Sequence, residues 1–448
     1  MSVLESTTGG ASVLAGTAVA TWSEAEPRRP SIFWSGTAWV SFSASFLTAF
    51  TLPIIGKMPV GEIPLTAAAL WALTTAAVNQ AWPGALLRQP LFRRLLVAQG
   101  IAFLGYIVSD LYRHSAPHDI ERGWGRMVLL AIDILGVAYL FGRSPRNLVV
   151  FVVGGALGEV ASAWLFGPLF GDMWKFGVGA PLTDLVFLVA PMTGAVGMSL
   201  AAAGIGAVHF LLDYRSFGGV CIVAGTVCLL LKVRPVFRLW LAPLFVALAA
   251  LACLWFFDGT RSRHRTTRSD IERQAMMTAA FEAVERSPLI GHGSWFSNSD
   301  VYDNFMRIRF AMAREAHVGG FADPNKRPDD MALHSQLLVA LAEGGLFGGA
   351  FFLLFGVELL RALCRLAIVG TWHRLAPLYV LLLLSALWNL CFSPFSGAHR
   401  VYIATACGLL LMLRDGRPRA GLAFGDQQAV AGSATPYGIT GLVHSGPL

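Results

Sequence analysis

One histidine and a set of cations stand at the ends of apolar segments, where they could act on a phosphorylated substrate. His334 heads the segment MALHSQLLVALAEGGLFGG (331–349), and an imidazole near neutral pH can accept a proton or bind an anion. Fixed cations at the ends of neighbouring segments could hold a diphosphate headgroup. These cations are Arg113, Arg122, Lys175, Arg215 and Arg400, and Arg273 stands in the one long polar segment.

Each of these residues also has an ordinary explanation. A long basic side chain at the end of a membrane helix can extend to the interface or pair with a nearby acid, here Asp110, Glu121 or Asp213. His334 could be an interfacial hydrogen-bonding residue, and Arg273 could lie on a solvated helix face. Five such cations on one membrane face fit this explanation less well, which favours a shared anionic ligand.

The elements that hold these residues are predicted to be membrane helices. Of the 448 residues, 55% are hydrophobic and only 14% are charged, whereas about 25% are charged in soluble proteins. Uncharged segments such as 31–52 and 239–257 reach the roughly 17–25 residues that a bilayer crossing requires. The net charge of +7 is then explained by membrane topology, and we expect no nucleic-acid partner. The predicted fold class is all-α, a polytopic membrane protein.

About twelve spans account for the apolar segments and for the short basic clusters. A single straight helix over 181–213 would be about 50 Å long, against a hydrocarbon core of ~30 Å, so we predict two short spans broken near 194–197. With both chain ends cytoplasmic, nearly every short basic cluster then faces the cytoplasm. The predicted spans are 32–54, 63–82, 95–111, 127–141, 148–167, 182–197, 199–213, 217–231, 239–257, 334–357, 375–394 and 400–413.

The predicted domain organisation follows from these spans. Residues 1–30 and 414–448 are rich in small and polar residues and are expected to be disordered and cytoplasmic. One large periplasmic loop, with short helices of its own, separates two sets of spans. The spans numbered 1–9 occupy 31–257, the loop occupies 258–332, and spans 10–12 occupy 333–413.

The periplasmic loop is predicted to contain two helices. Apolar residues recur at helical spacing over 271–286, with Arg273 on the polar side, and again near 305–316. A Ser-Pro step ends the first helix, and Gly291 and Gly293 permit tight turns after it. The chain has no HExxH, no Walker A and no GxSxG, and its six cysteines lie in or beside apolar runs. We therefore expect no metal, no cofactor and no disulfide.

Three stretches form a pattern when they are taken in order. A span ends at an Asp-Tyr-Arg-Ser step that contains Arg215. Arg273 is followed by a helix and then by Pro-Leu-Ile-Gly-His-Gly (288–293). His334 begins a helix that continues with Glu-Gly and a further Gly up to residue 348. The Arg-Ser step, the Arg–helix–Pro-x-x-Gly-x-Gly block and the His…Glu-Gly…Gly helix resemble the bacterial O-antigen ligase and polysaccharide polymerase superfamily.

The resemblance covers roughly residues 180–413, and the earlier spans are similar only in hydropathy. Two positions depart from the usual pattern. Ser335 stands where many members have Asn, and Met277 stands where many have Trp. Residues 109–126 look more like exopolysaccharide polymerases than ligases that act on the core lipid.

The resemblance implies a metal-independent, inverting glycosyltransferase of the bacterial inner membrane, with its active site facing the periplasm. Its donor would be an undecaprenyl-diphosphate-linked glycan and its acceptor a glycan or lipid A-core, for O-antigen or exopolysaccharide. A chain-length regulator or export proteins would be further partners. The implied catalytic residues are His334, Arg215 and Arg273, and the implied diphosphate- or glycan-binding residues are Arg122, Lys175, Arg400 and Arg113.

In such a reaction the arginines would stabilise the leaving diphosphate, and His334 would accept a proton from the acceptor hydroxyl. Nearby cations lower the pKa of a histidine and favour the neutral base, although His334 could instead bind the diphosphate. Glu343 lies about 13 Å along the helix, too far to contact His334, and is expected to pair with another helix. The glycine pairs at 344–345 and 348–349 are expected to allow close helix packing.

Other functions remain as alternatives. A transporter or flippase for the same lipid-linked glycans would show internal repeats and charges at mid-membrane, and the two halves of the chain show no clear similarity. A membrane scaffold would tolerate His334→Ala. Within the enzyme class, a ligase that transfers O-antigen specifically to lipid A-core is the alternative to a polymerase.

Overall fold

The computed structural model describes residues 35–52, 54, 58–79, 86–168, 171–238, 240–241, 266–296, 299–315 and 334–414. The chain divides into two units, Met1–Ser35 and Gly36–Leu448, and every element below belongs to the second. Two short strands, β1 (Thr51–Leu52) and β2 (Met58–Pro59), pair antiparallel. All other described elements are helical, so the all-α prediction is confirmed.

The helices run through the chain in a simple order. They are α1 (Gly36–Thr48), α2 (Glu62–Asn79), α4 (Pro90–Arg113), α5 (Pro117–Arg143), α6 (Pro145–Phe166), the π-helical turn η2 (Trp174–Val178), α7 (Gly179–Val189), the 3₁₀ turn η3 (Ala190–Thr193), α8 (Gly194–Leu211), α9 (Arg215–Leu230), α11 (Thr266–Arg286), the 3₁₀ turn η4 (Ser294–Phe296), α12 (Ser299–Glu315), α13 (Gln336–Val369), α14 (Ala376–Phe392) and α15 (Gly397–Arg414).

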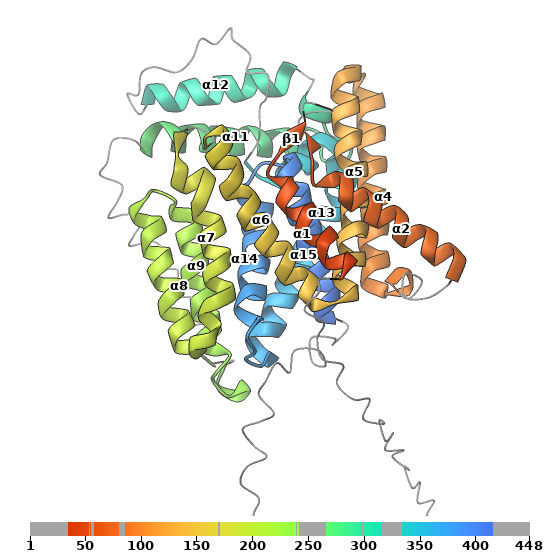
Figure 1. Cartoon of the computed structure of the whole chain (residues 1–448). Coiled ribbons are helices and arrows are strands. Elements are labelled where there is room, and N and C mark those ends of the chain that lie inside the picture. Colours follow the sequence, from red (N-terminus) through yellow and green to blue (C-terminus); the bar gives the residue numbers. More distant parts are fainter. Residues whose placement is uncertain are drawn as a thin grey trace, which may run out of the picture. The chain divides into compact units, whose positions relative to one another are not determined.

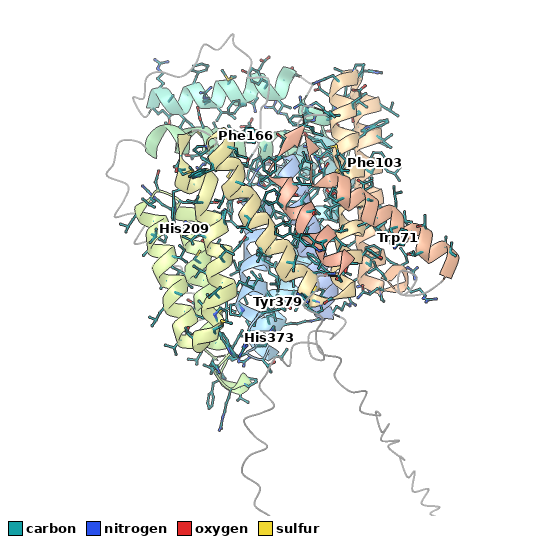
Figure 2. All side chains as sticks on the ribbon, viewed as in Figure 1. Trp71, Phe103, Phe166, His209, His373 and Tyr379 are labelled. Atoms are coloured by element: carbon teal, nitrogen blue, oxygen red, sulfur yellow. The ribbon has the colours of Figure 1, made fainter. Side chains whose placement is uncertain are left out.

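Many of these helices have the length and composition of membrane spans. Their outward side chains are apolar: Trp71 on α2 is 60% exposed and Phe166 on α6 is 75% exposed, as expected for surfaces that face lipid (Figure 2). Five described helical stretches are long and apolar enough to cross a membrane, namely Pro90–Arg113, Pro117–Gly142, Pro145–Phe166, Trp174–Leu211 and Gln336–Val369. Three shorter apolar helices are Glu62–Val78, Arg215–Leu230 and Ala376–Phe392.

These helices lie where spans were predicted from the sequence. The predicted span over 239–257 falls almost entirely outside the described residues. The total of twelve and the assignment of membrane sides therefore stay predictions.

The stretch from η2 to α8 reverses direction at Gly194, which has a φ of 85° and follows η3. His209, near the end of α8 (Figure 2), accepts a hydrogen bond from the indole nitrogen of Trp174 at 3.0 Å. Its other ring nitrogen lies 2.7 Å from the hydroxyl of Thr183. The two ends of this hairpin therefore meet at the same end of the bundle, in agreement with the predicted break near 194–197.

The helices α11 and α12 lie together across one end of the bundle, which we call the loop end (Figure 1). They share a small apolar cluster of Ala275, Ala279, Tyr302, Phe305 and Met306. The other face of α11 packs against α13 and contributes to the main core. The prediction of a helix over 271–286 is confirmed, and the second helix begins at Ser299, earlier than predicted.

The opposite end of the bundle holds basic clusters that were predicted to face the cytoplasm. Arg238 donates to the carbonyl oxygens of Leu231 and Gly370. The ammonium of Lys232 lies 5.6 Å from the centre of the Trp372 ring. The segment after α9 therefore adjoins the turn between α13 and α14, as the predicted alternation of spans requires.

Candidate functional site

The start of α13 is fixed by Ser335, and this fixes the position of His334. The hydroxyl of Ser335 accepts the backbone N–H of Leu338 at 3.2 Å, which makes it the N-cap, and it donates to the carbonyl oxygen of Leu390 at 3.3 Å. Ser335 therefore caps the helix and ties it to α14. His334 stands immediately before the cap, at the loop end.

Charged residues from two other elements, α11 and η2, lie near His334. Arg273 on α11, Lys175 on η2 and Glu272 on α11 all lie close enough to act on its ring electrostatically. Burial, then Arg273 and then Lys175 lower the pKa of His334 below its ordinary value of 6.5, and Glu272 opposes them. The imidazole is therefore held in its neutral form. His334 and Arg273 form no hydrogen bond within the described residues, and Arg273 is solvent-exposed.

Arg215 begins α9 in the same corner of the loop end. Its guanidinium lies 3.0 Å from the carboxylate of Asp213, so the predicted pairing with this acid is present. Trp174, the neighbour of Lys175, bonds to His209, whose ring packs against Tyr214 at 5.3 Å. These contacts place the segment that carries Arg215 beside the segment that carries Lys175.

Arg113 and Arg122 contact the loop that follows α11. Arg113 donates to the carbonyl oxygen of Gly291 at 2.9 Å and to the hydroxyl of Ser287 at 2.8 Å. The guanidinium of Arg122 lies 3.8 Å from the centre of the Trp295 ring. Both side chains hold the loop in place, so neither is included in the set of cations that we propose for the diphosphate.

Arg400 is buried inside the bundle and forms an ion pair with Glu62 of α2, with its Nε 2.9 Å from the carboxylate. Asp133 of α5 lies nearby, and both of its carboxylate oxygens are buried without a hydrogen-bond partner in the described structure. Arg400 is also left out of the proposed cation set, because it and its partner Glu62 are both buried inside the bundle. The ion pair of Arg215 differs, since its partner Asp213 is 59% exposed. Of the two ordinary explanations predicted for Arg400, extension to the interface and pairing with an acid, the structure shows the pairing.

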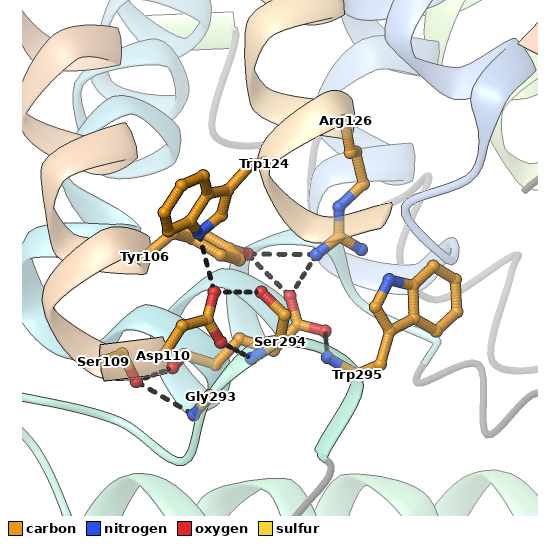
Figure 3. A network of polar contacts seen from close by, with 9 residues as sticks. Tyr106, Ser109, Asp110, Trp124, Arg126, Gly293, Ser294 and Trp295 are labelled. Atoms are coloured by element: carbon orange, nitrogen blue, oxygen red, sulfur yellow. Dashed lines mark hydrogen bonds and ion pairs between the residues drawn. The ribbon is translucent and has the colours of Figure 1, made fainter. Parts of the chain in front are cut away.

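Glu343 is buried and belongs to a polar network with Tyr106, Arg126 and Trp295, the three residues of this set that are labelled in Figure 3. Its carboxylate accepts the hydroxyl of Tyr106 at 2.7 Å and the backbone N–H of Trp295 at 3.0 Å, and it forms an ion pair with Arg126. The prediction that Glu343 pairs with another helix is confirmed, because Arg126 belongs to α5. Trp295 has a left-handed φ of 57°, and its bond to Glu343 holds this uncommon conformation.

Asp110 of α4 extends this network to η4. Its carboxylate accepts the backbone N–H of Ser294 at 2.6 Å, the Ser294 hydroxyl at 2.8 Å and the indole N–H of Trp124 at 2.9 Å (Figure 3). The hydroxyl of Ser109 accepts the N–H of Gly293 and donates to the carbonyl oxygen of Glu343. The network therefore joins the loop after α11 to α4, α5 and α13.

The same loop also bonds directly to the backbone of α13, which is interrupted at Gly345 with a φ of 64°. A Cβ on Gly345 would lie 2.1 Å from the carbonyl oxygen of Leu289, so only glycine fits there. The prediction of helix packing is right for Gly348, which meets Gly105 closely, and wrong for Gly345, which opens the helix. The bonds run from His292 N to Ala342 O, from Gly293 N to Glu343 O and from Leu346 N to Pro288 O.

Several residues beside His334 or in the Glu343 network were not predicted as part of the site from the sequence. His399 of α15 lies close enough to act on His334 electrostatically. Arg126, Asp110 and Tyr106 are far from the loop in sequence, so spacing could not connect them to it. The signal that could have identified Arg126 and Asp110 is a charge inside an apolar segment, which usually has a structural or functional partner. No group of three or more potential metal ligands was found in the described part of the chain.

Comparison with known proteins adds a family to this geometry. No curated protein matches the chain significantly. Residues 185–353 match the O-antigen ligase family, a stretch that begins in α7 and ends in α13. It includes Arg215, Arg273 and His334, which carry the three motifs seen in the sequence. This match confirms the resemblance of this part of the chain to the O-antigen ligase family.

Proposed function

We propose that the protein is an inner-membrane glycosyltransferase that acts on undecaprenyl-diphosphate-linked glycan at the periplasmic face. It polymerises this glycan or transfers it to an acceptor for a cell-surface polysaccharide. One observation carries the proposal. Arg273 of α11 and Lys175 of η2 both lie close enough to His334 to act on its ring electrostatically, although the three residues are far apart in sequence. The family match covers His334 and Arg273, and it implies an activity of the glycosyl-transfer type.

In the proposed reaction, the acceptor hydroxyl oxygen attacks the anomeric carbon of the donor sugar. A new glycosidic C–O bond forms while the bond from that carbon to the diphosphate breaks, and inversion follows from attack on the opposite face. Neutral His334 accepts the hydroxyl proton, a contribution of about 10²–10⁴-fold. Arg273, Lys175 and Arg215 stabilise the charge that develops on the leaving diphosphate.

The lowered pKa of His334 supports the base role over phosphate binding. A base must be neutral before it accepts a proton, and burial with two neighbouring cations keeps His334 neutral. A histidine that bound the diphosphate as an imidazolium would need the opposite environment. The Glu343 network has a different role in this proposal. It holds the loop that follows α11, the helix that carries Arg273.

The test compares variants in the native bacterium at equal protein level. We expect His334→Ala to lose polymeric glycan and Arg273→Ala to make less of it, while His118→Ala and Arg286→Ala keep the wild-type amount. His118 is exposed at the start of α5, and Arg286 is exposed on the same helix as Arg273. Normal glycan from His334→Ala would overturn the enzyme proposal and favour a transporter or scaffold.

The substrate that accumulates then separates the two enzyme classes. Loss of a polymerase leaves single repeat units on the lipid carrier, whereas loss of a ligase leaves long polymer there. Mass spectrometry of the lipid-linked glycans in His334→Ala cells gives this answer directly.

A further inference from the structure

A buried histidine on α8 joins the two segments that carry Lys175 and Arg215. His209, labelled in Figure 2, is fully buried, and an imidazole inside a membrane bundle is costly unless its ring nitrogens have partners. Both nitrogens have one. Nδ1 accepts the indole N–H of Trp174 at 3.0 Å, and Nε2 lies 2.7 Å from the hydroxyl of Thr183.

The partners fix the direction of each hydrogen bond around this ring. An indole N–H can only donate, so the imidazole is neutral and its proton lies on Nε2. The Thr183 hydroxyl donates to the carbonyl oxygen of Gly179 at 2.9 Å, and it accepts the N–H of Nε2. The bonds therefore run in one direction, from Trp174 through His209 and Thr183 to Gly179. A fully satisfied polar chain of this kind fixes one arrangement of the elements that it joins.

The bond from Trp174 sets the position of Lys175. Trp174 begins η2, and Lys175 is the next residue. The ring of His209 packs against the indole of Trp174 with the ring centres 5.4 Å apart. Gly179 makes room for this contact, because a Cβ there would lie 3.2 Å from both the His209 ring and the Trp174 indole nitrogen. The start of η2 is therefore held against α8 by a hydrogen bond and by ring packing.

The same histidine sets the position of Arg215. Its carbonyl oxygen accepts the backbone N–H of Tyr214 at 2.7 Å, across a turn in which Asp213 has a left-handed φ of 61°. The imidazole packs edge-on against the rings of Tyr214 and Phe217, with 5.3 and 5.1 Å between the ring centres. These two rings stack on one another at 5.2 Å. Arg215 follows Tyr214 directly, so the start of α9 is fixed on the same ring.

Lys175 and Arg215 are far apart in sequence, yet each directly follows a residue whose ring packs against His209. Two cations bind one diphosphate together only when their spacing matches its two phosphoryl groups, and a shift of about 1 Å in a binding group can cost up to about 10²-fold. We propose that His209 is a positioning residue that holds Lys175 and Arg215 at the spacing that lets both contact the donor diphosphate. This inference rests on the proposed function, in which these two cations stabilise the leaving group.

The first experiment removes one of the two ring bonds at a time. Trp174→Phe deletes the indole N–H and releases η2, whereas Thr183→Val deletes the hydroxyl and leaves η2 bonded to His209. The full-length variants are purified in lipid nanodiscs and supplied with lipid-linked glycan from His334→Ala cells. We expect kcat/KM for this donor to fall about tenfold in Trp174→Phe, the size of one charge-assisted contact, and to stay within about twofold of the wild type in Thr183→Val.

The second experiment replaces the ring and includes a conservative rescue. The amide of an asparagine reaches the position of Nδ1, and the amide of a glutamine reaches the position of Nε2. His209→Asn therefore keeps an acceptor for Trp174 and should retain most of the wild-type kcat/KM. His209→Gln keeps only the contact to Thr183 and should behave like Trp174→Phe. His373→Asn is the matched control, because His373 lies in the turn between α13 and α14 at the opposite end of the bundle.

Binding without turnover distinguishes this inference from the proposed function. The probe is undecaprenyl diphosphate without glycan, titrated onto each folded protein and followed by the rise in its thermal midpoint. Binding should be about tenfold weaker in Trp174→Phe and His209→Gln than in the wild type and Thr183→Val.

Two outcomes would overturn the inference. Equal binding and equal turnover in Trp174→Phe and Thr183→Val would show that His209 only supports the fold, while the enzyme stands. Failure of the wild type to bind undecaprenyl diphosphate would overturn the inference and the proposed function together. Normal product from His334→Ala, with carrier binding lost in Trp174→Phe alone, would overturn only the enzyme and leave the paired cations as a diphosphate site.

Discussion

Glu343 and His334 lie near the two ends of the first section of α13, yet their surroundings differ in kind. Glu343 has three hydrogen-bonding or ionic partners, from α4, α5 and η4, and it is 1% exposed. His334 has no hydrogen bond to the described residues and is surrounded by cations at a distance. A buried carboxylate with several partners holds elements of a structure together, whereas a polar ring without a hydrogen-bond partner is available to a ligand. The same helix therefore carries a structural clamp at Glu343 and begins next to His334, the residue that we propose for the reaction.

The largest expected effect comes from breaking the clamp. Arg126→Ala leaves the buried carboxylate of Glu343 without its cation, and removing one partner of a buried pair costs about 3–5 kcal/mol. We expect a large fall in the thermal midpoint of the detergent-purified protein and a low yield. Arg122→Ala, which removes a stacking contact with Trp295 and leaves the Arg126–Glu343 pair intact, should lower the midpoint much less. Equal midpoints for the two variants would show that the Arg126–Glu343 pair does not stabilise the fold.

A somewhat smaller effect is expected at the interruption of α13. Gly345→Ala places a side chain at a φ of 64° and against the Leu289 carbonyl, which should cost about 1–3 kcal/mol. Hydrogen exchange should then show faster exchange of the amides of His292 and Gly293, which bond to α13 here. Gly204→Ala is the control, because nothing lies within 4 Å of the added Cβ and α8 is helical there. Slower or unchanged exchange in Gly345→Ala would contradict the account of this docking.

A third effect concerns the reaction site alone. Arg273→Ala should reduce product formation at limiting donor by about tenfold, close to the 1.4 kcal/mol expected for one charge contact. Because Arg273 is exposed and forms no hydrogen bond within the described structure, the thermal midpoint should stay within error of the wild type. A variant with normal kinetics would place Arg273 on a solvated face without function.

The smallest and most specific effect is a shift in pH dependence. Since the pKa of His334 lies below 6.5, the base form persists at neutral pH, and product formation should fall only below that value. Arg273→Ala removes one cause of the depression, so the acid limb of the profile should move toward neutral pH. A rate that instead falls as pH rises through this range would assign His334 to phosphate binding as an imidazolium.

The sequence predicted the residues that meet at the loop end better than it predicted their contacts. His334 and Arg273 belong to recognisable local motifs, and Lys175 was selected from charge at the end of an apolar segment. Arg400 and Arg113 were selected by the same rule, yet they bind Glu62 and the Ser287–Gly291 turn. Sequence can place a cation on one face of a membrane, but only tertiary packing decides which acid or carbonyl reaches it.

The helices themselves followed from hydropathy and from spacing, including the hairpin at Gly194 and the two helices of the loop. The interruption of α13 could not be predicted from hydropathy or spacing. Glycine pairs in an apolar helix are equally compatible with close packing and with a break. The break at Gly345 depends on a loop some fifty residues earlier that supplies the missing backbone partners. Long-range pairing of this kind leaves no local signal in the sequence.

The most direct test of the central claim uses purified His334→Ala protein in lipid nanodiscs, supplied with lipid-linked glycan from cells that carry the same variant. If His334 is the base of a glycosyltransferase, the variant keeps the wild-type thermal midpoint, still binds the lipid-linked glycan and forms product at least 10²-fold more slowly. Wild-type rates of product formation from this folded variant would contradict the account.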